Sequence, residues 1–317
     1  MIAVYSSALR FGFRGLHTRD GVLLRGAAGW GEFSPFWDYD DVTCVPWLRA
    51  AVEAATLPFP DPVRDRVAVN VTVPAVDADT AHDIVAGSGC STAKVKVAQT
   101  GQVLVDDLDR VAAVRAALGP EGHVRVDANG AWSLDQARDA LPALDRAARG
   151  LQYAEQPVAS VADMARLRRV VDVPLAADES IRRADDPYAV RSLDAADLVV
   201  LKVQPLGGVR ACLRLARDLG MPVVVSSALE SSIGIAQGVA LAAALPGIGL
   251  ASGLATVRLF ADPVTSAPLL PVDGHLPIVR VTPDRLAAVD PALEARWRER
   301  LARVAELARI DLSAVLA

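Results

Sequence analysis

The sequence has few of the residues that form disulfide frameworks and zinc sites. Its 317 residues include three cysteines and four histidines. Cys44, Cys90 and Cys212 are an odd number, lie far apart and form no CxxC pair, which favours reduced thiols in the cytosol over disulfide bonds or zinc binding. The histidines are too widely separated for an HExxH metal motif. We therefore expect no metal site built from cysteine or histidine.

Long apolar runs and blocks of basic residues are also missing. No stretch of about 18 or more apolar residues occurs, so we expect no membrane-spanning helix. The N-terminal segment MIAVYSSALRFGFRGLHTRDG lacks the uninterrupted apolar core of a signal peptide. A net charge of −5 and a pI near 5.5, without a Lys/Arg-rich block, argue against binding to nucleic acid or anionic membranes. We expect a cytoplasmic protein with neither of these partners.

Strand and helix patterns alternate through the middle of the chain. The 52% hydrophobic and 22% charged composition supports a large core. From residue 66 onward, short β-rich runs alternate with amphipathic stretches rich in Ala, Leu and Arg, which indicates parallel strands joined by helical crossovers. The predicted strands are 67–73, 92–97, 123–129, 151–157, 174–180, 198–203, 222–229 and 248–252, with helices at 105–118 and 133–148.

The number of these units predicts the architecture. About eight strand–helix units within about 190 residues favour a closed (β/α) barrel. An open doubly wound sheet is the alternative, because periodicity alone does not establish closure. In the helix at 133–148, Ser133 followed by Gln136 predicts a capping box at the helix start.

The two ends of the chain break this rhythm and predict a separate unit. Near the N-terminus the pattern indicates a strand, a glycine turn and an aromatic loop, followed by a helix near 44–56. Beyond the barrel, LLPVDGHLPI is typical of a hairpin with an Asp-Gly turn, and 283–311 has a helical pattern. We predict an N-terminal capping domain at 1–66, a barrel carrying the active site at 67–255, and a C-terminal segment at 256–317 that returns to the cap.

Charged residues end four successive predicted strands. Asp127, Glu155, Asp178 and Lys202 are 28, 23 and 24 residues apart, about one strand–helix unit each. Neighbouring strands therefore each bring one charged group to the same mouth of the barrel, where barrel enzymes carry out their chemistry. Three converging carboxylates repel one another unless a cation lies between them. Oxygen ligands without histidine or cysteine favour Mg²⁺.

Two lysines share one face of the second predicted strand. Lys94 and Lys96 flank Val95 in TAKVKV, and alternate side chains of a strand point to the same side. Neighbouring ammonium groups repel, so each lysine makes the other easier to deprotonate. We expect this pair on one side of the cation and Lys202 on the other. Each charged residue alone has an ordinary interpretation as a cap or surface group, but together they form a mutually compensating set.

Taken together, these motifs resemble those of the enolase superfamily, in its muconate-lactonizing-enzyme-like subgroup. The matches are KVK, VDAN, YAEQP, ADES and LKVQPLGG on predicted strands two to six, and they cover nearly all of 67–210. GWGEFSP and DGHLPI resemble the capping segments. RDGVLLRG, GWGEFSPFWDYDD and SSALESSIG are similar to the o-succinylbenzoate synthases of actinobacterial type. The resemblance implies a (β/α)7β modified TIM barrel with an α+β capping domain.

The resemblance also implies a reaction, a dehydration in menaquinone biosynthesis. The implied substrate is the small carboxylate 2-succinyl-6-hydroxy-2,4-cyclohexadiene-1-carboxylate, which loses water to give 2-succinylbenzoate. Lys96 is expected to remove the ring proton and return it to the leaving hydroxyl, while Lys94 lowers its pKa and contacts the substrate carboxylate. The ammonium group of Lys202 is expected to lie against the ring and favour the anionic enediolate.

The resemblance, the strand-end positions and the aromatic-rich composition of the cap complete the expected site. The cofactor is expected to be one Mg²⁺, with Mn²⁺ as a substitute, bound by Asp127, Glu155 and Asp178. Loops at 12–21 and 29–40 are expected to close over the barrel mouth. Further substrate contacts are expected from Arg125, Asn129, Ser226 and Ser227. The alternative for Arg125 is an ion pair with a neighbouring carboxylate, and the alternative for the two serines is a turn or cap role.

Two other functions compete with this one. A racemase or epimerase of N-acylamino acids or dipeptides would exchange one α-proton between lysines on opposite faces. Dipeptide epimerases of the subgroup generally carry Asp-x-Asp at the end of strand eight, which LASGLATV lacks, whereas racemization of N-succinylamino acids stays open. A barrel that binds a ligand without catalysis is disfavoured, because losing catalysis normally relaxes the charged positions that are intact in this sequence.

Overall fold

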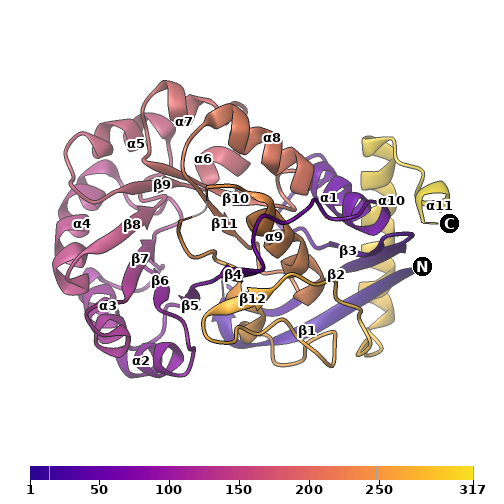
Figure 1. Cartoon of the computed structure of the whole chain (residues 1–317), viewed down its shortest axis with the longest axis horizontal. Helices are drawn as coiled ribbons and strands as arrows, with labels where there is room; N and C mark the ends of the chain where they lie inside the picture. The colour runs from indigo at the N-terminus through magenta and orange to yellow at the C-terminus, as the bar shows by residue number, and fades with distance from the viewer. Residues whose placement is uncertain (14, 248, 317) are drawn as a thin grey trace.

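Parallel strands joined by helices make up the larger part of the computed structural model, which describes residues 1–13, 15–247 and 249–316 (Figure 1). Seven strands form one sheet in the order β11-β10-β9-β8-β7-β6-β5, so consecutive strands are neighbours. This order requires a helical crossover between each pair. The strands are β5 (Val71–Val73), β6 (Thr92–Lys96), β7 (His123–Asp127), β8 (Leu151–Glu155), β9 (Leu175–Ala177), β10 (Leu198–Lys202) and β11 (Val223–Ser226).

A short segment closes this sheet into a barrel. Ser252 forms a parallel bridge with Val69, just before β5, and Gly253 forms one with Ser226 at the end of β11. The N–H of Gly253 donates to the carbonyl of Val225 at 2.8 Å. The closed barrel is therefore confirmed, and the open sheet is wrong. The eighth predicted strand, 248–252, is reduced to these bridges, and its first residue lies outside the described part of the chain.

Helices surround the barrel and bury their apolar faces against it. Ser133 accepts a hydrogen bond from the N–H of Gln136, whose side chain accepts one from the N–H of Ser133, so the predicted capping box is confirmed. The elements are α2 (Ala78–Ala86), α3 (Leu104–Leu118), α4 (Leu134–Ala148), α5 (Val161–Arg168), α6 (Glu179–Arg182), α7 (Ala189–Ser192), α8 (Val209–Leu219), α9 (Ser232–Ala244) and the 3₁₀ helix η1 (Ala255–Leu259).

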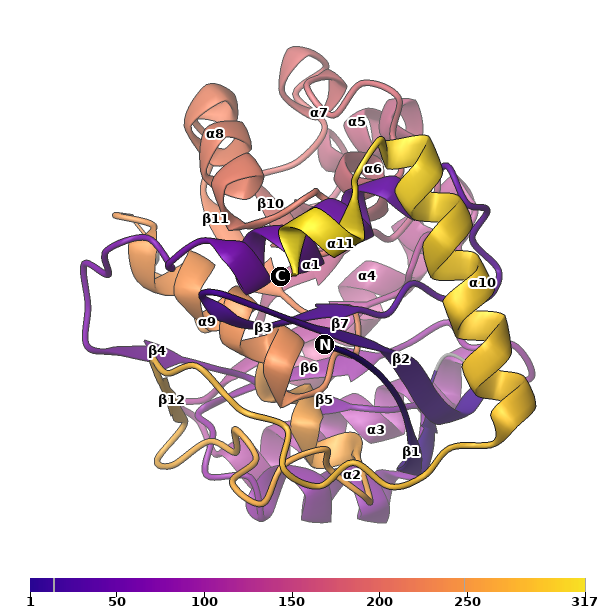
Figure 2. The ribbon, with the colours of Figure 1, turned by 90° about the vertical axis from the view of Figure 1, so that its right-hand side faces the viewer.

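Both ends of the chain build a cap beside the barrel (Figure 2). Its antiparallel sheet consists of β1 (Ile2–Phe13), β2 (Leu16–Gly26) and β3 (Gly29–Phe33). The ring of Trp297 lies 6.0 Å from that of Phe33, edge to face, within a hydrophobic cluster separate from the barrel core. On this basis we propose the predicted division into cap and barrel. The helices of the cap are α1 (Val45–Thr56), α10 (Pro291–Ala308) and α11 (Leu312–Val315).

The return from barrel to cap differs in part from its prediction. Asp273 and Gly274 form a two-residue turn with positive φ angles of 48° and 71°, as the Asp-Gly motif predicts. After this turn β12 (His275–Pro277) pairs with β4 (Arg66–Ala68), so the run predicted as one strand at 67–73 is split into β4 and β5.

The last helix begins later than predicted. The helix expected at 283–311 starts only at Pro291, with Asp290 as its cap. Proline lacks an N–H group and disfavours helical geometry in the residue before it, so a helix does not continue through this point.

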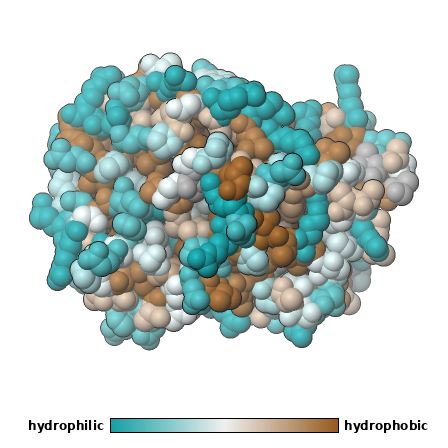
Figure 3. All heavy atoms as spheres, viewed as in Figure 1, coloured by the Kyte–Doolittle hydropathy of each residue, from teal (hydrophilic) through white to brown (hydrophobic). Residues whose placement is uncertain are grey.

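The outer surface mixes polar side chains with small apolar areas in the view of Figure 3. In the described part of the chain, no helix is both long enough and apolar enough to cross a membrane.

The contact between the cap sheet and α1 generates a stability prediction. A Cβ atom at Gly31 of β3 would lie 1.9 Å from the carbonyl oxygen of Ala51, so backbone must shift to admit it. Gly31→Ala is expected to destabilise the fold by about 1–3 kcal/mol and to lower the melting temperature. Gly12→Ala is the matched control, because its Cβ would meet its nearest atom at 3.4 Å. Equal melting temperatures for both variants would contradict this packing.

Candidate active site

Three carboxylates and three lysines meet at the carboxyl ends of the barrel strands. Strand β6 pairs with β7 so that Lys96 lies opposite Asp127, and β7 pairs with β8 so that Asp127 lies opposite Glu155. This register brings Lys96, Asp127 and Glu155 to one level, and Asp178 directly follows the next strand, β9. Asp127, Glu155 and Asp178 are at most 1% exposed.

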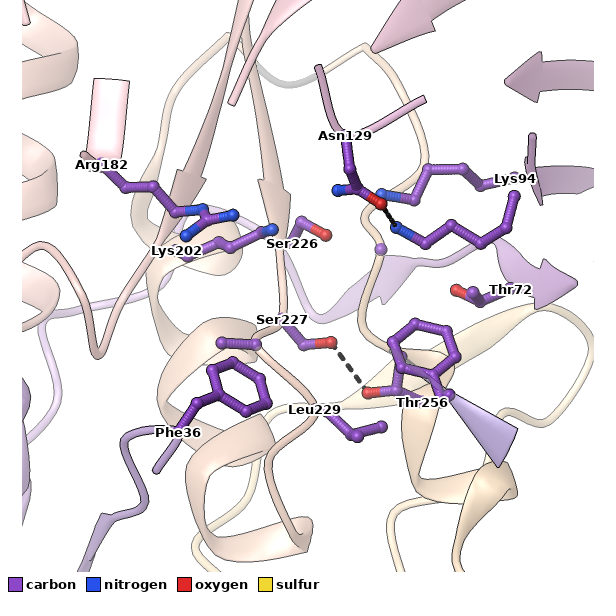
Figure 4. A pocket seen from close by; sticks show the side chains of 14 residues that line it. Phe36, Thr72, Lys94, Asn129, Arg182, Lys202, Ser226, Ser227, Leu229 and Thr256 are labelled. Carbon is purple, nitrogen blue, oxygen red and sulfur yellow. Dashed lines mark hydrogen bonds between the residues drawn. The ribbon is translucent and has the colours of Figure 1, made fainter. Parts of the chain in front are cut away.

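The lysines pair with these carboxylates from two sides. Lys94 Nζ lies 2.9 Å from Asp127 Oδ2 and 2.9 Å from each carboxylate oxygen of Glu155. Lys96 Nζ lies 2.7 Å from the same Asp127 oxygen. From β10, Lys202 Nζ lies 2.6 Å from Asp178 Oδ2. The two lysines of β6 therefore share a face, and Lys202 comes from a different wall of the barrel (Figure 4).

The two lysines of β6 differ in their proton affinity. Burial opposes the charge on Lys94, but the carboxylates of Asp127 and Glu155 outweigh it and hold the lysine pKa well above its usual value. For Lys96, burial and the Lys94 ammonium prevail over the attraction of Asp127, so its pKa is lowered. Lys96 is therefore the lysine of the pair that more readily loses its proton to give a neutral amine.

The carboxylates also differ from one another. Burial, reinforced by repulsion from Asp127, raises the pKa of Glu155 to about 7. Asp127 is equally buried, but Lys94 and Lys96 hold its pKa well below the usual range. The pKa of Asp178 is lowered against burial by Arg182 and Lys202.

The carboxylates fit a hard divalent cation in chemistry and burial. They offer oxygen donors only, lie on adjacent strands and repel one another enough to perturb Glu155. Within the described residues, no three acidic, histidine or cysteine side chains are arranged as a ready metal-ligand cluster. Lysine ammonium groups form ion pairs with all three carboxylates and compensate their charge.

A cavity opens beside these charges (Figure 4). Asn129 accepts a hydrogen bond from Lys96 at 2.6 Å and donates one to Glu179 at 3.2 Å. Five residues besides the two catalytic lysines were expected at the substrate. Four of them line this cavity, namely Lys94, Asn129, Ser226 and Ser227, and so do the two lysines, Lys96 and Lys202. Their roles toward substrate stay predictions.

Arg125 lies elsewhere. It is 0% exposed and does not line the cavity. Its Nε donates to Gln152 at 2.7 Å, its Nη1 donates to Asn70 at 3.0 Å, and the guanidinium lies 4.7 Å from the ring of Tyr153. Two positions along a strand correspond to about 6.6 Å, so Arg125 shares the face of Asp127 but lies deeper in the barrel. This geometry does not support the expected substrate contact.

The sequence pattern did not single out Arg182, which lines the cavity from α6. Its Nε donates to Asp178 Oδ1 at 2.9 Å, and its Nη1 donates to the hydroxyl of Tyr39 in the cap at 2.9 Å. The available signal was the i,i+4 spacing of Asp178 and Arg182, which brings the two side chains together on one helical turn.

The cap reaches the cavity through two aromatic residues, Phe13 and Phe36. The Lys96 ammonium lies 5.5 Å from the centre of the Phe13 ring. The segments expected as loops are partly strand: β1 runs to Phe13 and β2 starts at Leu16, with residue 14 outside the described part. Residues 29–33 belong to β3.

Behind the cavity a second buried polar cluster joins cap and barrel. Glu32 of β3 accepts hydrogen bonds from Tyr5 at 2.8 Å and from the N–H of Gly234 in α9 at 2.9 Å. Glu230, 3% exposed, accepts one from the N–H of Ala228 at 2.6 Å. Burial and the nearby Glu32 raise the pKa of Glu230 to about 7, against the opposing charge of Arg19.

Comparison with known proteins finds matching family models and similar relatives. Residues 77–284 match the family model described as enolase C-terminal domain-like, and residues 4–55 match the enolase N-terminal domain-like model. The chain is 58% identical over 302 residues to the o-succinylbenzoate synthase of Thermobifida fusca, covering 94% of each chain. It is 50% identical to the o-succinylbenzoate synthase of Mycobacterium leprae, covering 94% of this chain and 89% of the relative.

Solved structures share the fold at lower identity. The L-Ala-D/L-Glu epimerase from Bacillus subtilis superposes with a TM-score of 0.75 at 20% identity, covering 87% of this chain and 94% of that one. The muconate lactonizing enzyme from Pseudomonas fluorescens gives 0.74 at 22% identity, covering 96% and 98%. At this identity the likeness shows the fold alone.

The raised pKa of Glu230 predicts how stability depends on pH. Between the ordinary glutamate pKa, about 4.5, and about 7, the folded state binds more protons than the unfolded state. The contribution of this group to the free energy of unfolding is therefore largest below about 4.5 and falls as pH rises toward 7. Glu230→Gln keeps an oxygen acceptor for Ala228 but does not titrate. We therefore expect the free energy of unfolding of the variant to fall less than that of the wild type between pH 4.5 and 7, by at most a few kcal/mol (about 1.4 kcal/mol per pKa unit).

Urea unfolding at several pH values measures this effect. The matched control is Asp77→Asn, because Asp77 is an exposed helix cap whose pKa is lowered rather than raised. A wild-type curve and a Glu230→Gln curve that run parallel from pH 4.5 to 7 would contradict the assignment.

Proposed function

The chain belongs to the o-succinylbenzoate synthase family of the enolase superfamily, and on that premise we propose that it dehydrates 2-succinyl-6-hydroxy-2,4-cyclohexadiene-1-carboxylate to 2-succinylbenzoate. The observation that carries the proposal is the 58% identity over 94% of the chain. It is supported by a cavity that places lysines from two walls beside three buried carboxylates. Menaquinone biosynthesis in the cytoplasm is the setting that the sequence predicts.

Enzymes of this superfamily generally use a divalent metal ion, and we propose Mg²⁺, with Mn²⁺ as a substitute. Asp127, Glu155 and Asp178 would hold it. When bound, the ion supplies positive charge to the substrate carboxylate and stabilises the negative charge that develops when the neighbouring proton is removed.

Lys96 is proposed as the base. Its lowered pKa increases the fraction of neutral amine near pH 7, which is the form that accepts a proton. Nζ takes the proton from the ring carbon next to the carboxylate, and the electron pair of that C–H bond is delocalised toward the carboxylate. When the C–O bond to the hydroxyl breaks, the pair forms the ring double bond, and Lys96 returns the proton so that water leaves.

The other two lysines are proposed as fixed charges. The raised pKa of Lys94 keeps its ammonium positive beside Asp127 and Glu155. Lys202, bound to Asp178, brings a positive charge to the cavity from β10. Phe13 and Phe36 give the ring of the substrate apolar surface and exclude water from the proton transfer.

An N-succinylamino acid racemase is the second candidate. The specific observation in its favour is that Lys96 on β6 and Lys202 on β10 line the cavity from different strands, as a two-base proton exchange requires. Assaying purified protein with the cyclohexadiene substrate and with N-succinylamino acids separates the two reactions. Turnover of the N-succinylamino acid alone would replace the synthase proposal.

The two lysine faces give the first functional prediction. In a dehydration that removes and returns the proton on one face, Lys96→Arg should lose about 10²–10⁴-fold in kcat, because a guanidinium is not a base near pH 7. Lys202→Arg, which keeps the positive charge, should retain more activity. Exchange of the substrate α-proton with solvent deuterium is the cleaner measurement. Exchange that persists in Lys96→Ala but vanishes in Lys202→Ala would identify Lys202 as the base and contradict the assignment of Lys96.

The carboxylates give the second functional prediction. Asp127→Ala, Glu155→Ala and Asp178→Ala should each abolish Mg²⁺-dependent turnover, because each removes one of the proposed oxygen ligands. Circular dichroism checks that the fold is retained, and Asp163→Ala, an exposed helical carboxylate paired with Arg166, is the control. Full activity of EDTA-treated protein without added divalent ion would contradict the metal requirement.

A further inference from the structure

A strained turn forms part of the cavity wall. Ala228 and Leu229 connect β11 to α9 and line the cavity. Leu229 has a φ of 63°, in the left-handed region that residues with a branched side chain rarely adopt. Such a conformation persists only where surrounding contacts determine it, and it concentrates at functional sites.

An arginine of the cap holds this turn from outside. Arg19 lies on β2 and is 2% exposed. Its Nε donates to the carbonyl of Leu229 at 2.9 Å, and its Nη2 lies 3.4 Å from the carbonyl of Ala228. On the barrel side, the carboxylate of Glu230 accepts the N–H of Ala228 at 2.6 Å. The turn is therefore fixed by hydrogen bonds to both its N–H and its carbonyl groups.

The same arginine also holds the part of this wall that the cap provides. Its guanidinium carbon lies 4.5 Å from the centre of the Phe36 ring, which lines the cavity. Nη2 donates to the carbonyl of Ser34 and to the Ser34 hydroxyl at 3.1 Å, which anchors the chain leading to Phe36. In Figure 4, Phe36, Ser227 and Leu229 lie together, on the side of the cavity away from Lys94 and Asn129.

Arg19 itself does not line the cavity. Its hydrogen bonds within the described chain go to backbone carbonyls and to one hydroxyl, and no carboxylate is paired with it there. Planar geometry with several donors is what allows one side chain to bind two separate backbone segments while stacking on a ring, which a lysine does not reproduce.

We infer that Arg19 is a positioning residue that sets the distance between Phe36 and the Ala228–Leu229 turn, and thereby the shape of the substrate end bound between them. The identity of that substrate rests on the proposed function. The inference concerns how cap and barrel share one wall of the cavity, and it is independent of the metal ligands, none of which contacts Arg19.

The test compares Arg19→Met and Arg19→Lys with Arg10→Met. Arg10 is a matched control, because it also lies on a cap strand and donates to a backbone carbonyl outside the cap sheet, that of Phe260 at 3.2 Å, but it does not line this cavity. Arg19→Met should raise KM about tenfold or more with a smaller fall in kcat, since displaced walls weaken substrate binding first. The Mg²⁺ concentration for half-maximal activity should change less than twofold. Arg10→Met should leave KM unchanged.

A double-mutant cycle tests the mechanism through the turn. Glycine adopts positive φ without strain, so the Leu229→Gly background no longer needs Arg19 to hold the turn. The KM effect of Arg19→Met should therefore be several-fold smaller in that background than in the wild type. Additive effects of the two substitutions would overturn the inference, as would a lowered melting temperature with unchanged KM.

A crystal structure of Arg19→Lys gives a readout that needs no activity and survives if Arg19→Met fails to fold. The expected result is residue 229 outside the left-handed region and a displaced Phe36 ring. A turn and ring in their original places would overturn the inference. Failure of the wild-type protein to turn over the cyclohexadiene substrate would instead refute the proposed function and leave this structural result standing.

Discussion

Repulsion among three buried carboxylates is the constraint on which the rest of this site depends. Asp127 and Glu155 lie opposite each other where β7 and β8 end, Asp178 directly follows β9, and burial denies all three carboxylates water. Positive charge must therefore come from the protein or from a bound cation. Lysines from β6 and β10 provide it in this structure, while burial and repulsion from Asp127 still raise the pKa of Glu155 to about 7.

This balance separates the lysines into different roles. Lys94 faces two carboxylates, which raise its pKa, whereas Lys96, one alternation further along the same strand, is partly buried beside that ammonium and has a lowered pKa. In the proposed mechanism, a fixed charge and a base thus come from one KVK motif. The cap completes the arrangement, because Phe13 and Phe36 cover the cavity and Arg19 ties the cap to the turn after β11.

The sequence predicted the features that depend on local periodicity. Strand alternation put Lys94 and Lys96 on one face, and the spacing of Asp127, Glu155 and Asp178 put them on neighbouring strands. Alternation does not show how deep a side chain lies in the barrel, because that depth depends on the geometry of the whole barrel. Arg125 was therefore expected at the substrate, but it does not line the cavity. Contacts between distant segments leave no periodic signal, which is why Arg19 was not recognised. The start of α10 was misplaced because the helical sequence pattern extends upstream of Pro291, where the proline does not allow the helix to continue.

The central claim is that one divalent cation binds between the three carboxylates and neutralises their charge, with lysines on both sides of the substrate. A crystal structure with Mn²⁺ and 2-succinylbenzoate tests it most directly, because anomalous scattering locates the ion. The account predicts one peak within about 2.0–2.4 Å of oxygens from Asp127, Glu155 and Asp178, with Lys96 and Lys202 on opposite faces of the bound ring. An ion bound elsewhere, or both lysines on one face of the ring, would contradict it.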